Sequence, residues 1–443
     1  MAGFSKRPHR KTNGGHGGEE KKYEMPQDKD EDSVSYITPG LFGDDDDDDD
    51  DRPAAGRKGS RRRTVYDDDE FEEKKKPNIF VRALHAIFPV KGDGVGESVR
   101  KIIFDIAVVA FVITGGSVVK DIINEQINKV IVDEEVADLH DIASRGDEGV
   151  SPKSEEEKIK IIQGETGISD ADIETIKKEK PGIQADFLAL YNKNPDIVGW
   201  IKLGGKDDPI VNIDYPVMQA EDNDYYLTHN FKREDAPRGA IFADYRNKFE
   251  DGALSGNTVL YGHNMWTGDT MFAKLSRYYD GGVPKGETSD YMKFYRDHPT
   301  IEFDTLYENA EWKVFACVLF NTQEELGEVY PYINVRDFAN ADQFNTFILD
   351  IMDRSVLWTD VDLQYGDNIL TLSTCYYPYT KEKADTRVAV FARKVREGES
   401  AEVDTSKAMR NPDPLLFAYE YRVKGGSWGG RKWDSSKLLG YNG

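Results

Sequence analysis

Cys375 is the residue of this sequence whose type and position best suit nucleophilic chemistry. It ends the stretch Asn368–Cys375, whose β-branched and apolar residues favour a strand. At a period of two, Leu370 and Leu372 share one face of that strand, and Cys375 lies on the other. A thiol at the end of a strand combines a rigid base with access to substrate. A buried structural cysteine is the alternative that a single thiol leaves open.

His263 and Arg387 also stand at strand ends. His263 follows the predicted strand Thr258–Tyr261, and Arg387 opens the strand after the loop 376–385. If the two strands on either side of this loop pair antiparallel, Cys375 and Arg387 meet at one rim of a sheet. An imidazole can move the protons of a thiol and an amine, and a guanidinium can hold a developing oxyanion. Taken singly, a histidine or arginine at such a position is as easily a surface residue.

The composition separates a folded part of the chain from a charged remainder. The net charge is −24 over 443 residues, and only 38% of the residues are hydrophobic, which is low for a wholly folded protein. We therefore expect residues 1–101, which include eight consecutive aspartates, to be a disordered, charged cytoplasmic tail. The acidity argues against nucleic acid as a partner.

The two cysteines, Cys317 and Cys375, allow neither a disulfide framework nor a CxxC metal or redox motif. Cys317 shares a predicted strand face with Phe315 and Leu319, which favours a core position. We expect no metal and no other cofactor, because no ligand cluster or phosphate-binding glycine loop follows a predicted strand.

Ile102–Val119 is the most continuous apolar segment of the sequence. As a helix it would be about 27 Å long, close to the thickness of a hydrocarbon core. Lysines and arginines are more frequent before it than after it, which favours a cytoplasmic N-terminus. The sequence therefore predicts a transmembrane signal anchor over 102–119, a single-pass cell-membrane protein and an extracellular catalytic domain. A buried core helix is the alternative, and a helical stalk is expected over 120–182.

The part of the chain from Val198 onward consists of short β-rich runs separated by turns. The predicted strands are Val198–Leu203, Ile210–Met218, Ala240–Asp244, Thr258–Tyr261, Ile301–Leu306, Trp312–Phe320, Ile369–Thr374 and Arg387–Val395. Two helices precede them, one capped by Ser169 and one over Ile183–Asn192, and the amphipathic helix Ala341–Met352 interrupts them. Many short strands with one long crossover helix favour a mostly β fold, a closed barrel with helices. Residues 397–443 form an appendage without a predicted role.

Three stretches together resemble the sortases, specifically class B. They are Asn-Thr-Val-Leu-Tyr-Gly-His-Asn-Met over 257–265, Thr-Leu-Ser-Thr-Cys over 371–375, and the strand that begins with Arg387. The blocks 213–231 and 239–246 resemble the same family. The resemblance implies a catalytic domain over 183–396 with the eight-stranded sortase-type barrel, and a cysteine transpeptidase.

The resemblance also implies roles for individual residues. Cys375 would be the nucleophile, His263 the general acid and base, and Arg387 the residue that orients substrate and stabilises the oxyanion. The positions that match the family's peptide groove are Asn223, Leu227, Tyr261 and Ser373, with Tyr332 and Ile333 as further candidates. Tyr376 departs from the family, since many class B members carry an acidic residue after the cysteine.

Such enzymes cleave the C-terminal sorting signal of a secreted surface protein after its threonine. The resemblance implies that Cys375 holds the product as a thioester and passes it to an amine of a peptidoglycan precursor. A pilin lysine is an alternative acceptor, and water would make the protein an extracellular cysteine protease. Papain-like proteases place the cysteine before the histidine, which is the opposite order. A surface module without catalysis remains a third class, and the membrane is an expected partner through one helix.

Overall fold

The computed structural model describes residues 87–111, 114, 137–139, 154–204, 208, 210–249, 253–265, 270–280, 290–379 and 384–441. The chain divides into two compact units, Met1–Ile106 and Ala107–Gly443. Most of the predicted tail and the parts 120–136 and 140–153 of the predicted stalk lie outside the described residues.

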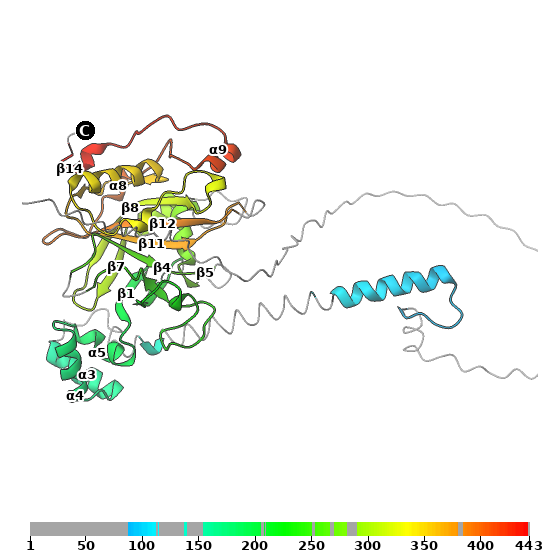
Figure 1. The fold of residues 1–443 in the computed structure, drawn as a ribbon, viewed down its shortest axis with the longest axis horizontal. Coiled ribbons are helices and arrows are strands. Elements are labelled where there is room, and N and C mark those ends of the chain that lie inside the picture. Colours follow the sequence, from blue (N-terminus) through cyan, green and yellow to red (C-terminus); the bar gives the residue numbers. More distant parts are fainter. Residues whose placement is uncertain are drawn as a thin grey trace, which may run out of the picture. The chain divides into compact units, whose positions relative to one another are not determined.

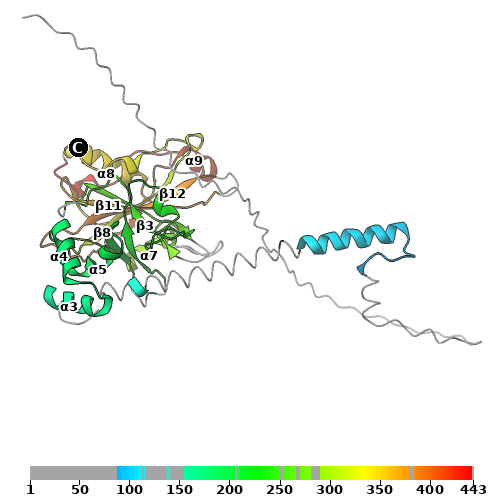
Figure 2. The same cartoon turned by 60° about the horizontal axis from the view of Figure 1, so that its bottom comes forward.

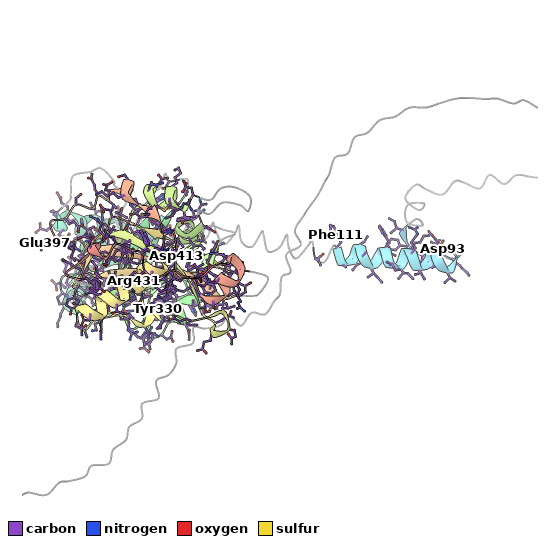
Figure 3. All side chains as sticks on the ribbon, turned by 90° about the horizontal axis from the view of Figure 1, so that it is seen from above. Asp93, Phe111, Tyr330, Glu397, Asp413 and Arg431 are labelled. Carbon is purple, nitrogen blue, oxygen red and sulfur yellow. The ribbon has the colours of Figure 1, made fainter. Side chains whose placement is uncertain are left out.

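The segment expected to cross a membrane begins as a helix over residues 95–111 (Figure 3). Its first turns are charged, and Lys101 forms an ion pair with Asp93 at 2.8 Å. Across the described part of the chain, no helix is both long enough and apolar enough to span a membrane. This finding contradicts the predicted single-pass anchor and the membrane localisation inferred from it.

Within residues 154–196, three helices lead into the first strand of the barrel. They are α3 (Glu155–Thr166), α4 (Asp170–Glu179) and α5 (Ala185–Lys193). Ser169 caps α4 as predicted, since its hydroxyl accepts from the backbone N–H of Asp172 at 3.2 Å in a capping box. Buried residues of all three helices belong to one hydrophobic cluster, which also contains Trp200 of the first strand.

The strands form the closed barrel that the sequence predicts (Figure 1). Its strands are β1 (Ile197–Leu203), β2 (Ile213–Met218), β3 (Ile241–Ala243), β4 (Asn257–Tyr261), β7 (Thr300–Thr305), β8 (Glu311–Asn321), β11 (Ile369–Cys375) and β12 (Thr386–Lys394). Their order is β1-β2-β3-β4-β11-β12-β8-β7. The second strand starts later than predicted because the Asp208 carboxylate accepts from the backbone N–H groups of Ile210 and Val211 and turns the chain there.

Alternation along β11 sorts its residues as the sequence predicts. Leu370 and Leu372 lie in the barrel interior, whereas Cys375 ends the outer face. Cys317 is also interior and fully buried, and burial raises the pKa of its thiol well above the ordinary value. Its predicted core position is confirmed.

The helix α8 (Ala341–Arg354) covers the outer face of the barrel beside β8 and β12. Shorter elements complete the domain: β5 (Asn264–Met265), β6 (Thr270–Met271), α6 (Arg277–Asp280), α7 (Tyr291–Asp297), β9 (Leu357–Trp358) and β10 (Leu363–Gln364), with the 3-10 turns Tyr225–Leu227, Ala273–Ser276, Glu324–Leu326 and Tyr332–Asn334.

The C-terminal residues fold onto the domain, on the side that carries α8 (Figures 1 and 2). The strand β13 (Met409–Arg410) pairs with β9, and β14 (Leu438–Leu439) pairs with β10. The helix α9 (Ala418–Lys424) lies between them in the chain. Trp433 and Leu438 are buried in the cluster around α8, so this segment is an integral part of the packed domain.

Candidate active site

Cys375 and Arg387 face each other across two neighbouring strands. They are paired residues in the antiparallel register of β11 and β12, so their side chains leave the same face of the sheet. Cys375 is half-buried, and Arg387 is 8% exposed. The hairpin that the sequence predicts from the loop 376–385 therefore brings thiol and guanidinium to one rim.

Arg387 keeps its charge because of the groups around it. Its guanidinium donates to the carbonyl oxygen of Thr386 at 3.0 Å and pairs with the Asp385 carboxylate. Burial works against the charge, but the interactions with Cys375 and Asp385 outweigh it and raise the pKa of Arg387 above its ordinary value. The site thus holds a permanent cation beside the thiol.

His263 reaches the same rim from the other side of β11. The strand β4 runs parallel to β11 with Tyr261 opposite Ser373, which brings the residues after Tyr261 to the level of Cys375. The hydroxyl of Thr374 donates to the Gly262 carbonyl at 2.8 Å, and the Asn264 amide donates to the Cys375 carbonyl at 2.7 Å. These bonds hold the exit of β4 against the strand that carries the thiol.

The His263 ring is oriented by the backbone of Leu227. Its Nε2 lies 2.9 Å from the Leu227 carbonyl oxygen. Since a carbonyl only accepts, Nε2 is assigned as the protonated nitrogen, which leaves Nδ1 as the acceptor.

Gly262 owes its place to close packing. Its φ angle is outside the left-handed region. A Cβ atom there would lie 2.4 Å from Ile241 Cδ1 and 2.8 Å from Phe272 Cγ. Only a residue without a side chain lets the strand exit and the Phe272 ring approach so closely.

Two of the predicted peptide-groove residues bind a buried carboxylate. The Tyr261 hydroxyl and the Asn223 amide donate to Asp244 Oδ2 at 2.9 and 3.2 Å. Asn223 is 5% and Tyr261 8% exposed. Asp244 forms an ion pair with Arg246 at 2.7 Å. Burial opposes the charge of Asp244, and the bonds from Arg246 outweigh it and lower the pKa of Asp244. These two groove residues therefore support a neighbouring ion pair.

Ser373 packs behind the thiol in a similar way. Its hydroxyl is 2.8 Å from the Tyr332 hydroxyl, and both residues are buried. Burial is the main cause that raises the pKa of Tyr332 to about 12. Leu227 and Ile333 are partly buried at the edge of the cluster that includes Tyr261. The polar groups of Asn223, Tyr261, Ser373 and Tyr332 are thus engaged by protein, and their role in a peptide groove stays a prediction.

Comparisons with known proteins identify the family. Residues 209–395 match the model of the Sortase domain family. Sortase B of Staphylococcus aureus (strain NCTC 8325 / PS 47) is 34% identical over 224 residues, which are 50% of this chain and 79% of the relative. Sortase B of Listeria monocytogenes serovar 1/2a is 37% identical over 193 residues, which are 44% of this chain and 68% of the relative. The chain belongs to the sortase family. It is a class B sortase and a sortase-type cysteine transpeptidase.

Solved structures of sortase B are also similar to this sortase. The Staphylococcus aureus sortase B-substrate complex is 31% identical and has a TM-score of 0.40, covering 54% of this chain and 93% of its own. Clostridium perfringens sortase B is 31% identical with a TM-score of 0.37, covering 47% of this chain and 98% of its own.

Three residues of this sortase site were not singled out from the sequence. Asn264 binds the carbonyl of Cys375, and Asp385 binds Arg387. Tyr377 is a neighbour of Cys375, and partial burial followed by the electrostatic interaction with Cys375 raises the pKa of its phenol. Asn264 and Asp385 stand one and two positions from predicted catalytic residues, which is the signal that could have found them.

Proposed function

We propose that this sortase cleaves a sorting signal after its threonine and transfers the acylated protein to an amine of a cell-wall precursor. The observation that carries the proposal is the pairing of Cys375 with Arg387 while His263 extends from the adjacent parallel strand. A thiol, a permanent cation and an imidazole then share one rim of the barrel.

The proposed first half-reaction opens the peptide bond. His263 takes the thiol proton, and the thiolate attacks the threonine carbonyl carbon. The Arg387 guanidinium stabilises the oxyanion that forms. When the carbon–nitrogen bond breaks, His263 returns its proton to the leaving amine, and a thioester remains on Cys375.

The second half-reaction uses the same groups in reverse. An acceptor amine attacks the thioester carbonyl, His263 takes the amine proton, and the thiolate leaves and is reprotonated. The proposed donor partners are sorting-signal peptides, in keeping with the similarity to a sortase B described as a substrate complex. A peptidoglycan-precursor amine is the proposed acceptor.

Quenched peptides built on Asn-Pro-x-Thr and Leu-Pro-x-Thr-Gly test the proposal with the full-length protein. We expect cleavage after threonine, a thioester on Cys375 detectable by mass spectrometry, and an amine-linked product when a precursor amine is added. If the acyl group is transferred to a pilin lysine in preference to the precursor amine, the pilin lysine replaces the proposed acceptor. Hydrolysis undiminished by saturating amine would overturn the transpeptidation.

Two cysteine variants form a matched pair for the nucleophile. Cys375→Ala removes the only thiol of the rim, so we expect no measurable cleavage. Cys317→Ala alters a fully buried core thiol and should leave the thioester in place, with some loss of stability. Loss of cleavage in folded Cys317→Ala, with activity kept in Cys375→Ala, would contradict the assignment.

A further inference from the structure

Residues 411–424 lie beyond the part of the chain that matches the Sortase domain model, yet they contact the loop that follows Cys375. We name this segment the C-terminal brace. Within it, the Glu420 side chain is only 1% exposed. Glu420 Oε1 accepts from the Tyr379 hydroxyl at 2.8 Å and from the Tyr279 hydroxyl at 3.1 Å, and it pairs with Lys424 at 2.6 Å. Tyr379 belongs to the loop between the proposed nucleophile and Arg387.

Aromatic contacts hold the same loop residue. The Tyr379 ring meets the Tyr419 ring edge-on at a centroid distance of 5.3 Å and the Phe417 ring at 6.3 Å. Tyr379 is therefore fixed by a buried hydrogen bond at its hydroxyl and by two rings of the brace. A buried bond to a carboxylate is a stronger restraint than a neutral one.

The brace also reaches the far end of the loop. A Cβ atom on Gly327 would lie 2.6 Å from the backbone nitrogen of Ala418, so the turn before Gly327 abuts the start of α9. In that turn region, Gln323 accepts from the backbone N–H of Asp385 at 3.1 Å, and Thr322 donates to the Asp385 carboxylate at 2.6 Å. Asp385 in turn pairs with Arg387.

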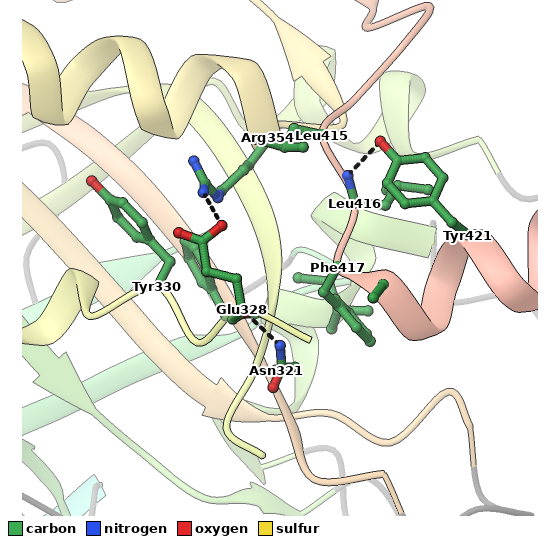
Figure 4. Close-up of a pocket in the computed structure, with 11 residues that line it drawn as sticks. Asn321, Glu328, Tyr330, Arg354, Leu415, Leu416, Phe417 and Tyr421 are labelled. Atoms are coloured by element: carbon green, nitrogen blue, oxygen red, sulfur yellow. Dashed lines mark hydrogen bonds and ion pairs between the residues drawn. The ribbon is translucent and has the colours of Figure 1, made fainter. Parts of the chain in front are cut away.

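The other end of the brace is fastened to α8 and the strand that follows it. The Asn411 amide donates to the Ser355 carbonyl at 2.7 Å, and the Leu415 N–H donates to the Asp353 carbonyl at 2.8 Å. Between brace and β8 lies a cavity of about 260 Å³, lined among others by Phe320, Glu328, Arg354 and Leu415 (Figure 4). Residues 415–418 of the brace line this cavity, on the side opposite β8.

We propose that the C-terminal brace positions the two described ends of the loop between β11 and β12, residues 376–379 and 384–385, for catalysis, and that Glu420 is its central positioning residue. By holding Tyr379 and the neighbourhood of Asp385, it keeps the Cys375 thiol and the Arg387 guanidinium at the separation that one acyl group requires. The inference rests on the proposed function, since that function assigns Cys375 and Arg387 to the chemistry. Misplacement of reacting groups by about 1 Å costs on the order of a hundredfold in rate.

The test compares four single variants of the full-length protein and, in a second step, one double variant. Tyr379→Phe removes one hydroxyl and keeps the ring, and Glu420→Ala removes its acceptor. Glu420→Gln keeps a side-chain oxygen that can accept from the hydroxyls of Tyr379 and Tyr279. Val423→Ala, at an exposed position of α9, is the matched control. We expect Tyr379→Phe and Glu420→Ala each to lower kcat for thioester formation roughly tenfold with KM little changed, because the loop is loosened rather than the peptide groove.

Two further readouts separate positioning from general stability. Hydrogen exchange of residues 376–385 should quicken in Tyr379→Phe and Glu420→Ala but not in Glu420→Gln or Val423→Ala. The double variant Tyr379→Phe/Glu420→Ala should be no slower than Glu420→Ala, since both changes break one contact. If the wild-type protein is active and Tyr379→Phe and Glu420→Ala form the thioester at the wild-type rate, the positioning role of the brace is refuted and the proposed function stands. If hydrogen exchange of the loop quickens in these variants but even the wild-type protein acylates no peptide, the proposed function is refuted instead.

Discussion

Arg387 illustrates at the scale of one residue how this site keeps a charge where water is scarce. The guanidinium is almost wholly buried, which disfavours its charged form, yet its pKa is raised because Cys375 and the Asp385 carboxylate lie beside it. A buried cation is tolerated when it is paired and hydrogen-bonded, as Arg387 is with Asp385 and Thr386. Its planar donors are thereby fixed before any substrate arrives.

Replacing Arg387 by lysine tests whether fixed geometry or charge alone matters. Arg387→Lys keeps the positive charge but loses the planar fork, so we expect the single-turnover rate of thioester formation to fall about a hundredfold. Arg422→Lys, at an exposed position of α9, is the matched control and should be unchanged. An unaltered rate in Arg387→Lys would remove the fixed donors from the mechanism.

The residues of the proposed triad were predictable because each occupies a strand end, and strand ends follow from local sequence. Period-two alternation places Cys375 on the outer face, and the hairpin places Arg387 opposite it. The engagement of Tyr261 and Asn223 by Asp244 was not predictable, because that contact joins three separate parts of the chain. Side-chain partners across such separations depend on the packed fold.

At the scale of elements, long periodic segments were predicted well and short ones were not. The helix α8 shows its apolar face in sequence, whereas α3 carries a run of charged residues with a weak apolar pattern and was covered only by the broad prediction of a helical stalk over 120–182. The two-residue strands β13 and β14 exist only because β9 and β10 offer them edges. Their sequences contain no strand signal of their own.

The approach of β4 to the segment at Phe272 gives an element-scale prediction. Gly262→Ala would drive a methyl group into Ile241 and the Phe272 ring, so we expect a loss of about 1–3 kcal/mol in unfolding free energy and a displaced His263. Denaturant midpoints and kcat measure the two effects. Gly164→Ala, on α3 with no atom within 4 Å of its added carbon, is the control and should be neutral or slightly stabilising. A Gly262→Ala protein with unchanged stability and kcat would show that these elements can separate freely.

Across the whole molecule, the closed barrel and its strand order follow from the number of strands, their turns and one crossover helix. The predicted membrane anchor is contradicted, because no helix among the described residues is both long enough and apolar enough to span a membrane. The contacts of residues 397–441 with the domain did not follow from their sequence, which is rich in glycine and aromatic residues. Two charged residues of this segment pair with buried partners on the barrel and α8, Glu399 with Arg393 and Arg431 with Asp353.

The Glu399 network makes the stability of the folded domain depend on pH. Arg393 is fully buried and donates two bonds of 2.7 Å to Glu399, which also accepts from Lys313 at 2.6 Å. The bonds from Arg393, followed by those from Lys313, overcome burial and hold the pKa of Glu399 well below its ordinary 4.5. Because the unfolded carboxyl binds protons first, this contribution is complete above about pH 5 and is lost as the pH falls below 4.5.

Glu399→Gln should therefore lower the unfolding free energy by about 2 kcal/mol at pH 7, since it removes one of the two carboxylates that pair with the buried Arg393, the other being Asp362. The difference from the wild type should narrow as the pH is lowered from 5 to 3, because the unfolded wild-type carboxyl binds protons over this range while the folded carboxylate keeps its charge. Urea unfolding at a series of pH values measures both. Glu402→Gln, on an exposed side chain nearby, should leave the unfolding curve unchanged at pH 7. A gap between Glu399→Gln and the wild type that stays constant down to pH 3 would show that packing rather than charge makes Glu399 important.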